Sequence, residues 1–271
     1  MPIKNSKIQW TGPTFNPWQG CVKKTIRIAS QTVLREECRN CYMYRDKKRY
    51  GQKPQIVVRS KPPTFNKPLK WQKEAELGLR SGTDRLVFTC SWSDFFNPEA
   101  DGWRDEAWEI IRQCPDLIFQ ILTKLPERIG DHLPVFWDEI KSHIWLGYSC
   151  GMPGTEGGIE HLIKHDSAIR FLSCEPLLGR IDVERFLYRH QSAHRVDWVI
   201  VGGESGPEAR SMNIVWLDLL MRQCRMAKVP FFVKQMGSAQ AKANGARDTH
   251  GGNMDDWSEE YKIREFPKER V

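Results

Sequence analysis

The sequence contains no long hydrophobic run, and this absence excludes one large class of protein. The amino-terminal segment MPIKNSKIQW has no apolar stretch, and the longest hydrophobic runs, such as 198–201, are far too short to cross a bilayer. We therefore expect a cytoplasmic protein with no membrane contact. Neither the G-x-G-x-x-G dinucleotide fingerprint nor a P-loop is present, which argues against NAD-dependent and NTP-hydrolysing enzymes.

The eight cysteines lack the dense, regular spacing of a secreted disulfide scaffold. Five of them lie in or beside apolar segments, where a free thiol behaves as a small hydrophobic side chain. A reducing compartment fits this use best. These five are Cys90, Cys114, Cys150, Cys174 and Cys224.

The other three cysteines, Cys21, Cys38 and Cys41, share a polar, turn-rich setting as Cys-x16-Cys-x2-Cys. Three thiolates can hold zinc or an iron–sulfur cluster, and a site one ligand short leaves a coordination position for a substrate or cofactor. A histidine would close a zinc site instead, but the nearest one along the chain is His132. The pattern predicts a metal centre and leaves its type open.

Positive charge is concentrated around these thiols. The net charge is +7, and residues 22–73 contain fifteen Lys or Arg against three acids, so the rest of the chain is net acidic. A basic segment beside a metal site predicts a polyanionic partner such as DNA or RNA, because neutralising phosphates releases counterions. A solvated surface is the alternative. The predicted phosphate contacts are Lys23, Lys24, Arg27, Lys47, Lys48 and Arg49.

Short apolar runs alternate with stretches able to form helices along the rest of the chain. The runs lie at residues 85–90, 117–122, 143–148, 168–172, 197–201 and 229–233, and helices are predicted over 102–114, 156–165 and 215–227. Near-continuous apolar strands alternating with helices indicate a parallel sheet covered on both faces. We expect an α/β fold: a full or partial (β/α) barrel of parallel strands with an N-terminal cysteine-rich cluster loop.

A chain of 271 residues can bury one substantial core, so one main domain is expected. The barrel domain, including the cluster loop 16–57, is assigned to residues 1–237. The polar segment 238–271 is assigned to an extension packed on the same domain. Residues 58–70, with three prolines, are predicted to form an extended loop that leads into the barrel.

Polar side chains follow the predicted strands, and barrel chemistry gathers where strands end. We assign catalytic roles to Cys174, Glu175 and Lys124. Glu175 could act as a base, or could form a structural ion pair with Lys124 or Lys234. Cys174 could donate a hydrogen atom to a substrate radical, as could Cys90 or Cys150, although a packed thiol is the default for any one of them.

The segment 202–206, Gly-Gly-Glu-Ser-Gly, follows another strand and would let the backbone approach a ligand closely. Glu204 could accept hydrogen bonds from an amino group or a ribose hydroxyl, but a tight turn explains the glycines nearly as well. The predicted cofactor-binding residues are Tyr42, Ser91, Asp94, Ser149, Gly202, Gly203 and Glu204.

Several segments together resemble a known family. They include Phe-Asn-Pro-Trp-Gln-Gly-Cys at 15–21, Cys-Arg-Asn-Cys-Tyr at 38–42, Leu-Thr-Lys at 122–124, Arg-Phe-Leu-Ser-Cys-Glu-Pro-Leu-Leu-Gly at 170–179 and Phe-Phe-Val-Lys-Gln at 231–235. In this order, from about residue 6 to the end, the chain resembles a phage-associated family with a three-cysteine motif. That family is radical-S-adenosylmethionine-like and of unknown function. More distantly, the chain is similar to spore photoproduct lyase.

The resemblance implies a [4Fe-4S] cluster on Cys21, Cys38 and Cys41, whose open iron binds S-adenosylmethionine. It also implies an electron donor such as flavodoxin or ferredoxin, in a bacterial or phage-infected bacterial cell. Two departures stand out. Sixteen residues separate the first two cysteines, where the superfamily commonly has three, and the Gly-Gly-Glu segment comes late in the chain.

Three functions remain open at this stage. The leading one is a radical enzyme that modifies or repairs a nucleic-acid base. The second is a nucleic-acid-binding protein with a structural zinc site, and the third is a radical enzyme acting on a small molecule or peptide. The sequence sets no oligomeric state.

Overall fold

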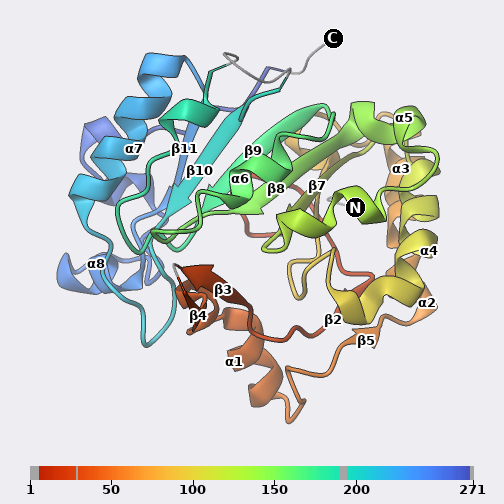
Figure 1. Cartoon of the computed structure of the whole chain (residues 1–271), viewed down its shortest axis with the longest axis horizontal. Helices are drawn as coiled ribbons and strands as arrows, with labels where there is room; N and C mark the ends of the chain where they lie inside the picture. The colour runs from red at the N-terminus through yellow and green to blue at the C-terminus, as the bar shows by residue number, and fades with distance from the viewer. Residues whose placement is uncertain (1–5, 29, 189–193, 269–271) are drawn as a thin grey trace.

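Seven parallel strands form the central sheet of the protein (Figure 1). The structure is a computed structural model and describes residues 6–28, 30–188 and 194–268. The strand order is β1-β6-β7-β8-β9-β10-β11, and every neighbouring pair is parallel. The strands are β1 (Thr14–Phe15), β6 (Leu86–Thr89), β7 (Ile118–Thr123), β8 (Ile144–Ser149), β9 (Ile169–Cys174), β10 (Trp198–Gly202) and β11 (Phe231–Gln235).

The sheet curves into a half-barrel and stays open, with β1 and β11 at opposite edges. This confirms the prediction of a partial barrel. Each of the apolar runs predicted as a strand is one, from β6 to β11. One strand of this sheet was missed: β1 precedes the cysteines and has only two residues, paired as Thr14 with Phe88 and Phe15 with Thr89. The short strands of two smaller sheets, β2 (Trp18–Gln19) with β5 (Val58–Arg59) and β3 (Thr25–Ile28) with β4 (Gln31–Leu34), were missed as well.

The two faces of the sheet are covered differently. Alternate strand residues point to opposite sides, so Val87 packs in the larger hydrophobic cluster with the helices, whereas Leu86 and Phe88 belong to a second cluster. No helix residue belongs to this second cluster among the described residues. Its cover comes from the chain ends, since Trp10 is buried there and Phe266 packs against it.

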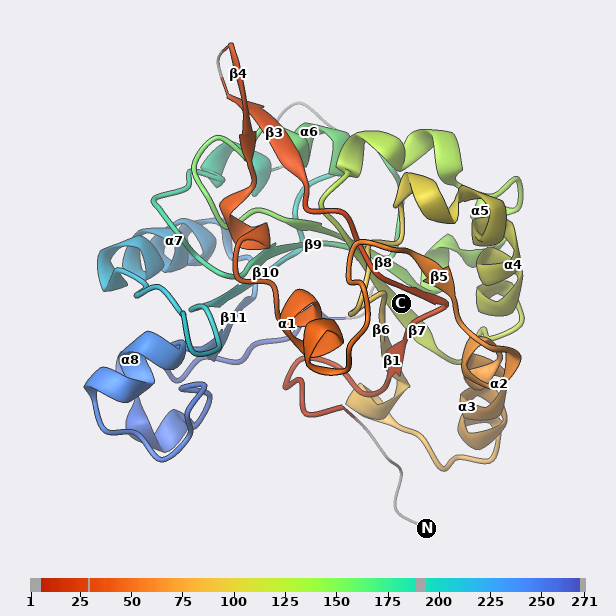
Figure 2. The same cartoon turned by 90° about the horizontal axis from the view of Figure 1, so that it is seen from below.

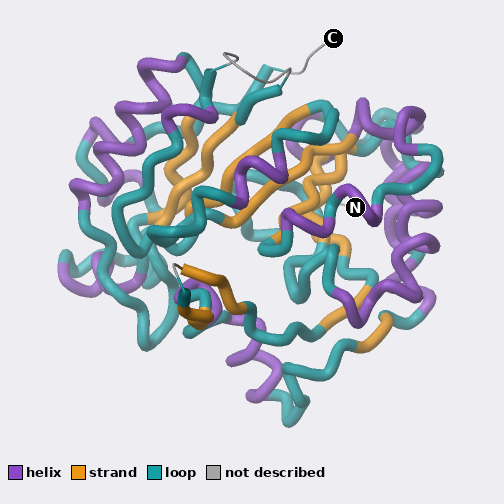
Figure 3. Tube along the Cα trace, in the orientation of Figure 1, coloured by secondary structure: helices purple, strands orange, loops and turns teal. Residues whose placement is uncertain are grey.

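The helices, purple in Figure 3, are α1 (Tyr42–Arg49), α2 (Pro62–Phe65), α3 (Lys67–Glu76), α4 (Asp101–Arg112), α5 (Trp137–Ile140), α6 (Gly158–Leu162), α7 (Ile214–Ala227) and α8 (Ser238–Ala243). Helices α2 to α7 contribute to the larger hydrophobic cluster on the outer face of the sheet, whereas α1 lies beside the carboxyl ends of the strands. In α4, Ala107, Trp108 and Ile111 are fully buried, at the spacing of one helix face. The 3-10 helices are η1 (Glu36–Cys38), η2 (Gly82–Arg85), η3 (Pro98–Ala100), η4 (Pro126–Arg128), η5 (Gly130–His132), η6 (Lys141–His143), η7 (Glu184–Phe186), η8 (Met254–Asp256) and η9 (Glu259–Tyr261).

Two predictions about local structure were wrong. Residues 58–70 do not form an extended loop, because they contain β5 (Val58–Arg59), α2 and the start of α3. Proline at the first helical positions of α2 and α3 is compatible with a helix, since those positions have no intrahelical acceptor for an N–H group. Helix α6 is also shorter than the predicted 156–165.

The chain beyond residue 237 contacts the edge strand β11. The Val233 N–H donates to the Ile263 carbonyl at 2.8 Å, and Phe232 forms an antiparallel bridge with Arg264. The Trp198 indole also donates to the Glu265 carbonyl at 2.8 Å. These contacts cover the edge strand β11, so that a strand of another chain cannot pair with it there. No helix in the described part of the chain has the length and apolar character needed to cross a membrane.

Candidate functional site

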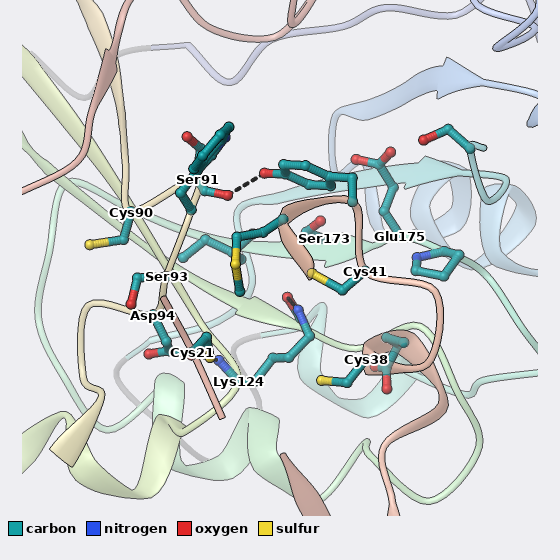
Figure 4. A pocket seen from close by; sticks show the side chains of 18 of the residues that line it. Cys21, Cys38, Cys41, Cys90, Ser91, Ser93, Asp94, Lys124, Ser173 and Glu175 are labelled. Atoms are coloured by element: carbon teal, nitrogen blue, oxygen red, sulfur yellow. Dashed lines mark hydrogen bonds between the residues drawn. The ribbon is translucent and has the colours of Figure 1, made fainter. Parts of the chain in front are cut away.

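A cavity of about 440 Å³ opens at the carboxyl edge of the sheet. One wall comes from the cluster loop and carries all three cysteines of the motif, and the other comes from residues that follow the strands (Figure 4). In a parallel α/β sheet the ends of different strands converge at this edge, so side chains far apart in sequence share one space.

The long interval between the first two cysteines folds as a hairpin. Strands β3 (Thr25–Ile28) and β4 (Gln31–Leu34) pair antiparallel, with Thr25 opposite Leu34. Below them the Arg35 N–H donates to the Lys24 carbonyl at 2.9 Å, so the chain returns to its starting point before Cys38. The hairpin projects from the body in Figure 2. The sixteen intervening residues therefore do not separate Cys21 from the other two thiols.

Cys21 is held by contacts on both sides of the loop. Its N–H donates to the Pro54 carbonyl at 3.0 Å, and the Tyr44 hydroxyl donates to the Cys21 carbonyl. Gly20, with φ of +103°, is required just before it, because a Cβ there would lie 2.1 Å from the Ile56 carbonyl oxygen. Burial raises the pKa of the Cys21 thiol to about 12, although the charge of Lys24 opposes the shift.

The three thiols of the motif share one cavity. Cys21, Cys38 and Cys41 all line it, with Cys38 at the end of η1 and Cys41 just before α1. Among the described residues, no group of three Cys, His, Asp or Glu side chains has the geometry of a single metal-ion site. Three thiolates are a donor set that suits zinc or an iron–sulfur cluster.

A buried ion pair ties the cluster loop to the sheet. The Arg35 Nη2 lies 2.7 Å from Glu37 Oε1, and neither side chain is more than 2% exposed. The same guanidinium donates to the Ser149 carbonyl at 2.6 Å and to the Lys124 carbonyl at 3.0 Å. Burial raises the pKa of the Glu37 carboxyl, but the charge and hydrogen bonds of Arg35 outweigh it and hold that pKa below its ordinary value.

Asp94 lines the cavity but uses its carboxylate to join two strand ends. Its Oδ1 accepts from the Thr123 hydroxyl at 2.7 Å and its Oδ2 from the Lys124 N–H at 2.7 Å. Both oxygens are engaged and the residue is buried. The geometry thus favours a structural tie between β6 and β7 over the predicted direct contact with a cofactor.

Two pairs of polar side chains at the strand ends line the cavity. The Lys234 Nζ lies 2.7 Å from Glu175 Oε1, so of the two predicted partners of Glu175 it is Lys234 that pairs with it. The Lys124 Nζ donates to the Ser149 hydroxyl at 3.2 Å. Both pairs line the cavity, together with Ser173.

Tyr42 spans the cavity from the cluster loop to the end of β6. Its hydroxyl donates to the Ser91 carbonyl, which Figure 4 marks with a dashed line. Asn16 holds the Ser91 hydroxyl at 3.0 Å from the other side. The predicted site residues Tyr42 and Ser91 therefore do come together.

Glu204 lies in the cavity wall, but its carboxylate is occupied. Arg210 donates to it through its backbone N–H at 2.8 Å, Nε at 2.9 Å and Nη2 at 2.6 Å. Burial raises the pKa of the Glu204 carboxyl, but these hydrogen bonds and the charge of Arg210 bring it below its ordinary value. The predicted contact of Glu204 with a cofactor amino group is corrected accordingly, since few acceptor positions remain.

Cys174 does not reach the cavity. It is fully buried in the larger hydrophobic cluster, and alternation along β9 instead turns Ser173 to the cavity. Burial raises the pKa of the Cys174 thiol well above its ordinary value. The predicted catalytic role of Cys174 is therefore corrected to core packing. Cys150 is likewise in the core, whereas Cys90 lies in the cavity wall.

Gly202 and Gly203 allow neighbouring atoms to pack closely because they have no side chains. A Cβ on Gly202 would lie 2.9 Å from Glu175 Oε1, and one on Gly203 would lie 2.1 Å from the Met236 carbonyl oxygen. Both glycines are thus needed for close approach, although Gly203 alone lines the cavity.

The predicted phosphate contacts divide into two groups. Arg27, Lys48 and Arg49 are exposed. Lys47 is buried, because it lies one turn after the buried Met43 on the inner face of α1, and burial lowers the pKa of its amine.

Two further lysines of that prediction are engaged at the site. The Lys23 Nζ donates to the Arg39 carbonyl at 2.7 Å, and Lys24 is buried in the cavity wall. The prediction of free phosphate contacts is thus corrected for Lys23, Lys24 and Lys47. Arg35, in the same basic segment, is buried as well.

Sequence reasoning missed several residues of the site. Asn16 carried a faint signal, since it belongs to the Phe-Asn-Pro-Trp segment before Cys21. Arg210 carried none, because nothing in its surroundings marks it as the partner of a glutamate six positions earlier.

The sequence profile of one protein family, described as protein of unknown function (DUF5131), matches residues 5–263. No curated protein and no solved structure matches the chain.

Proposed function

We propose that this chain, which belongs to a family of proteins of unknown function (DUF5131), is a radical S-adenosylmethionine enzyme with a [4Fe-4S] cluster on Cys21, Cys38 and Cys41. One observation carries the proposal. The three thiols line a single cavity at the carboxyl edge of a half-barrel. A site with three protein ligands leaves the fourth iron open for a small molecule.

When bound and reduced by one electron, the cluster supplies cleavage of S-adenosylmethionine into methionine and a 5′-deoxyadenosyl radical, which takes a hydrogen atom from the substrate. The electron comes from a donor of the flavodoxin or ferredoxin class. Such a donor and free thiols belong to a reducing compartment, so the proposal includes the cytoplasm of a bacterial or phage-infected bacterial cell.

The residues of the chain bind and orient within this cavity. Lys234 and Glu175 present opposite charges 2.7 Å apart, which complements a zwitterionic amino-acid group such as that of S-adenosylmethionine. Lys124 and Ser149 supply donors on a neighbouring strand end. Tyr42 closes one side of the cavity through Ser91 and limits access of water.

A nucleic acid is the proposed substrate. The chain from residue 39 to residue 73 exposes many cations, and its single acid, Asp46, is not exposed. These side chains lie within the cluster loop or just after it, and they can bind phosphates without reading the base sequence. They are Arg39, Arg45, Lys48, Arg49, Lys53, Lys61, Lys67, Lys70 and Lys73.

Anaerobic reconstitution tests the enzyme class. We expect about four iron atoms per chain, with broad visible absorbance and release of 5′-deoxyadenosine under strong reductant. Cys38→Ala should lose both the iron and this release. Cys174→Ala is the matched control: it should keep the iron, with a stability loss of about 1 kcal/mol from the small cavity.

Other outcomes would contradict the proposal. Colourless protein with one zinc per chain would instead support a zinc-stabilised binding protein. An intact cluster without 5′-deoxyadenosine release would exclude the proposed cleavage. Full cleavage with no affinity for DNA or RNA at low salt would shift the substrate to a small molecule or peptide.

A further inference from the structure

Two of the three cluster thiols sit on a segment that is fastened to a distant strand end. Cys38 and Cys41 enclose Asn40, and Glu36 lies just before them in η1. The residues that fasten this segment come after β10, far along the chain from the two cysteines. The contact set consists of Arg210, Glu204, Glu36 and Asn40, and we call it the Arg210 clamp.

Arg210 is the centre of this clamp. Its guanidinium Nη2 lies 2.6 Å from Glu204 Oε1, and its Nη1 lies 2.8 Å from Glu36 Oε2. The same Nη2 donates to the Glu36 carbonyl at 2.9 Å. One planar cation thus bridges two carboxylates and a backbone oxygen, a geometry that arginine provides and lysine does not.

Asn40 adds a second connection between the same segments. Its amide nitrogen donates to Glu204 Oε2 at 3.2 Å and to the Glu208 carbonyl at 2.8 Å. Asn40 stands directly between the thiols of the Cys-x2-Cys pair. Fixing its side chain therefore restricts the backbone that carries both.

The segment after β10 is itself anchored on its other side. The Ser238 N–H donates to the Glu204 carbonyl at 2.8 Å, and the Gly206 N–H donates to the Ser238 hydroxyl at 3.0 Å. Gln235 donates to the Gly203 carbonyl at 2.8 Å. The clamp thus connects the Cys-x2-Cys segment to β11 and α8 rather than to a free loop.

Cys21 is positioned by different contacts. The Cys21 N–H donates to the Pro54 carbonyl, and the Tyr44 hydroxyl donates to the Cys21 carbonyl. Neither Pro54 nor Tyr44 belongs to the clamp. Loss of the clamp should therefore release Cys38 and Cys41 while leaving Cys21 in place.

We infer that Arg210 and Glu204 are positioning residues that preset the Cys-x2-Cys thiols for metal binding before any metal arrives. The role in metal binding rests on the proposed function, whereas the test of the clamp uses metal-free protein and does not depend on that function. The Gly-Gly-Glu segment then acts on the cluster loop instead of on the cofactor.

Alkylation of the metal-free protein tests the clamp without a cluster. Arg210→Ala should raise the iodoacetamide reaction rates of Cys38 and Cys41, followed by peptide mass spectrometry, relative to Cys21. We expect roughly tenfold or more, since a hydrogen bond to a charged group contributes about 1.4 kcal/mol or more and each 1.4 kcal/mol is a factor of ten. Arg210→Lys should restore part of the protection.

The control is Arg185→Ala, which removes an exposed arginine paired with Glu160 at 2.6 Å on the surface. It should leave all thiols unchanged. Glu204→Gln serves as a second variant if Arg210→Ala does not fold, and should give an intermediate rise at the same two thiols.

Three results would overturn the inference. One is unchanged reactivity of Cys38 and Cys41 in Arg210→Ala. Another is an equal rise at all eight cysteines in both Arg210→Ala and Glu204→Gln, which would mean that these residues hold the whole fold and not the two thiols in particular. The third is an equal rise at Cys21, which would mean that one set of contacts holds all three thiols. Iron content after reconstitution is measured separately, so absence of iron in the wild type would contradict the proposed function and leave the clamp standing.

Discussion

Lys234 and Glu175 form an ion pair, 2.7 Å apart, that passes over the strand between them. Glu175 follows β9 and Lys234 belongs to β11, whereas β10 lies between these strands in the sheet. The pair can form because β10 ends in Gly202, whose missing side chain leaves room for the carboxylate. Both charges remain partly exposed to the cavity, at 21% and 14% of their side-chain surface.

Gly202→Ala should therefore disturb the site more than the fold. The new Cβ would meet the end of the flexible Glu175 side chain, so we expect a stability loss of about 1 kcal/mol or less in urea denaturation. Release of 5′-deoxyadenosine by the reconstituted protein should fall, because the carboxylate moves away from Lys234. If release of 5′-deoxyadenosine and binding of S-adenosylmethionine are both unchanged, the ion pair of Lys234 and Glu175 takes no part in the proposed site.

Gly203→Ala is the matched comparison. Its Cβ would meet the Met236 carbonyl, which is backbone and cannot step aside. We expect a loss of about 3 kcal/mol or more in the same urea measurement. Equal stability of the two variants would show that the close approaches at these glycines are not as tight as described.

The Arg35 and Glu37 pair should show strong coupling in a double-mutant cycle. Arg35→Met leaves a buried carboxylate without its partner, so we expect a loss of about 3–5 kcal/mol. The double variant Arg35→Met/Glu37→Met should lose less than the sum of the single variants, because no uncompensated charge remains. Additive effects in urea denaturation would mean that the two groups do not act as a pair.

Removing three exposed cations of α1 should weaken nucleic-acid binding. Replacing Arg45, Lys48 and Arg49 by alanine should lower affinity for a single-stranded DNA at low salt. The slope of log K against log salt should become shallower by about 0.7 for each phosphate that the variant no longer neutralises.

The charge-matched control uses the carboxyl end of α7, which lies apart from α1 (Figure 1). Replacing the exposed Arg222, Arg225 and Lys228 by alanine removes the same charge. Equal weakening of binding in both triple variants would mean that overall charge, and not the α1 surface, attracts the polymer.

Stability should decrease as the pH falls below 6.5. Burial lowers the pKa of His143 below its ordinary 6.5, so just below that pH the unfolded chain binds a proton that the folded chain does not. Stability is then lost as the pH drops towards the folded pKa, at up to about 1.4 kcal/mol per pH unit for each such histidine. His132 and His165 shift in the same direction through burial.

His143→Phe should flatten this dependence between pH 5 and 6.5, measured by urea denaturation. The window lies above the ordinary carboxyl values near 4, so buried carboxylates do not obscure it. An unchanged slope in the variant would show that folding does not shift the pKa of His143.

The main sheet could be predicted because its strands from β6 to β11 are nearly continuous apolar runs, as strands buried on both faces require. Strand β1 could not, since two residues carry no periodicity. The prolines at 62, 63 and 68 suggest a loop, although the first turn of a helix accepts proline. Local sequence does not tell these two uses apart.

The sequence predicts which residues lie at strand ends and therefore line the cavity. It does not predict which charged side chains pair with one another. Residues at strand ends such as Ser91, Lys124 and Glu175 do line the cavity, because topology alone brings strand ends together. The burial of charged residues could not be predicted in this way. Arg35 and Lys47 look like surface cations in the sequence, and only the fold shows that Arg35 pairs with Glu37 and that Lys47 lies on the buried face of α1. The pairing of Glu204 with Arg210 was hidden for the same reason.

Because of the hairpin β3–β4, the number of residues between Cys21 and Cys38 does not determine the positions of these two cysteines. Since its two strands begin and end side by side, residues can be added to or removed from its tip while Cys21 and Cys38 stay where they are. A motif search that fixes the spacing of the first two cysteines would pass over this chain. In related sequences, the length of this interval should vary freely while the Cys-x2-Cys spacing, which the helix start at α1 constrains, should not.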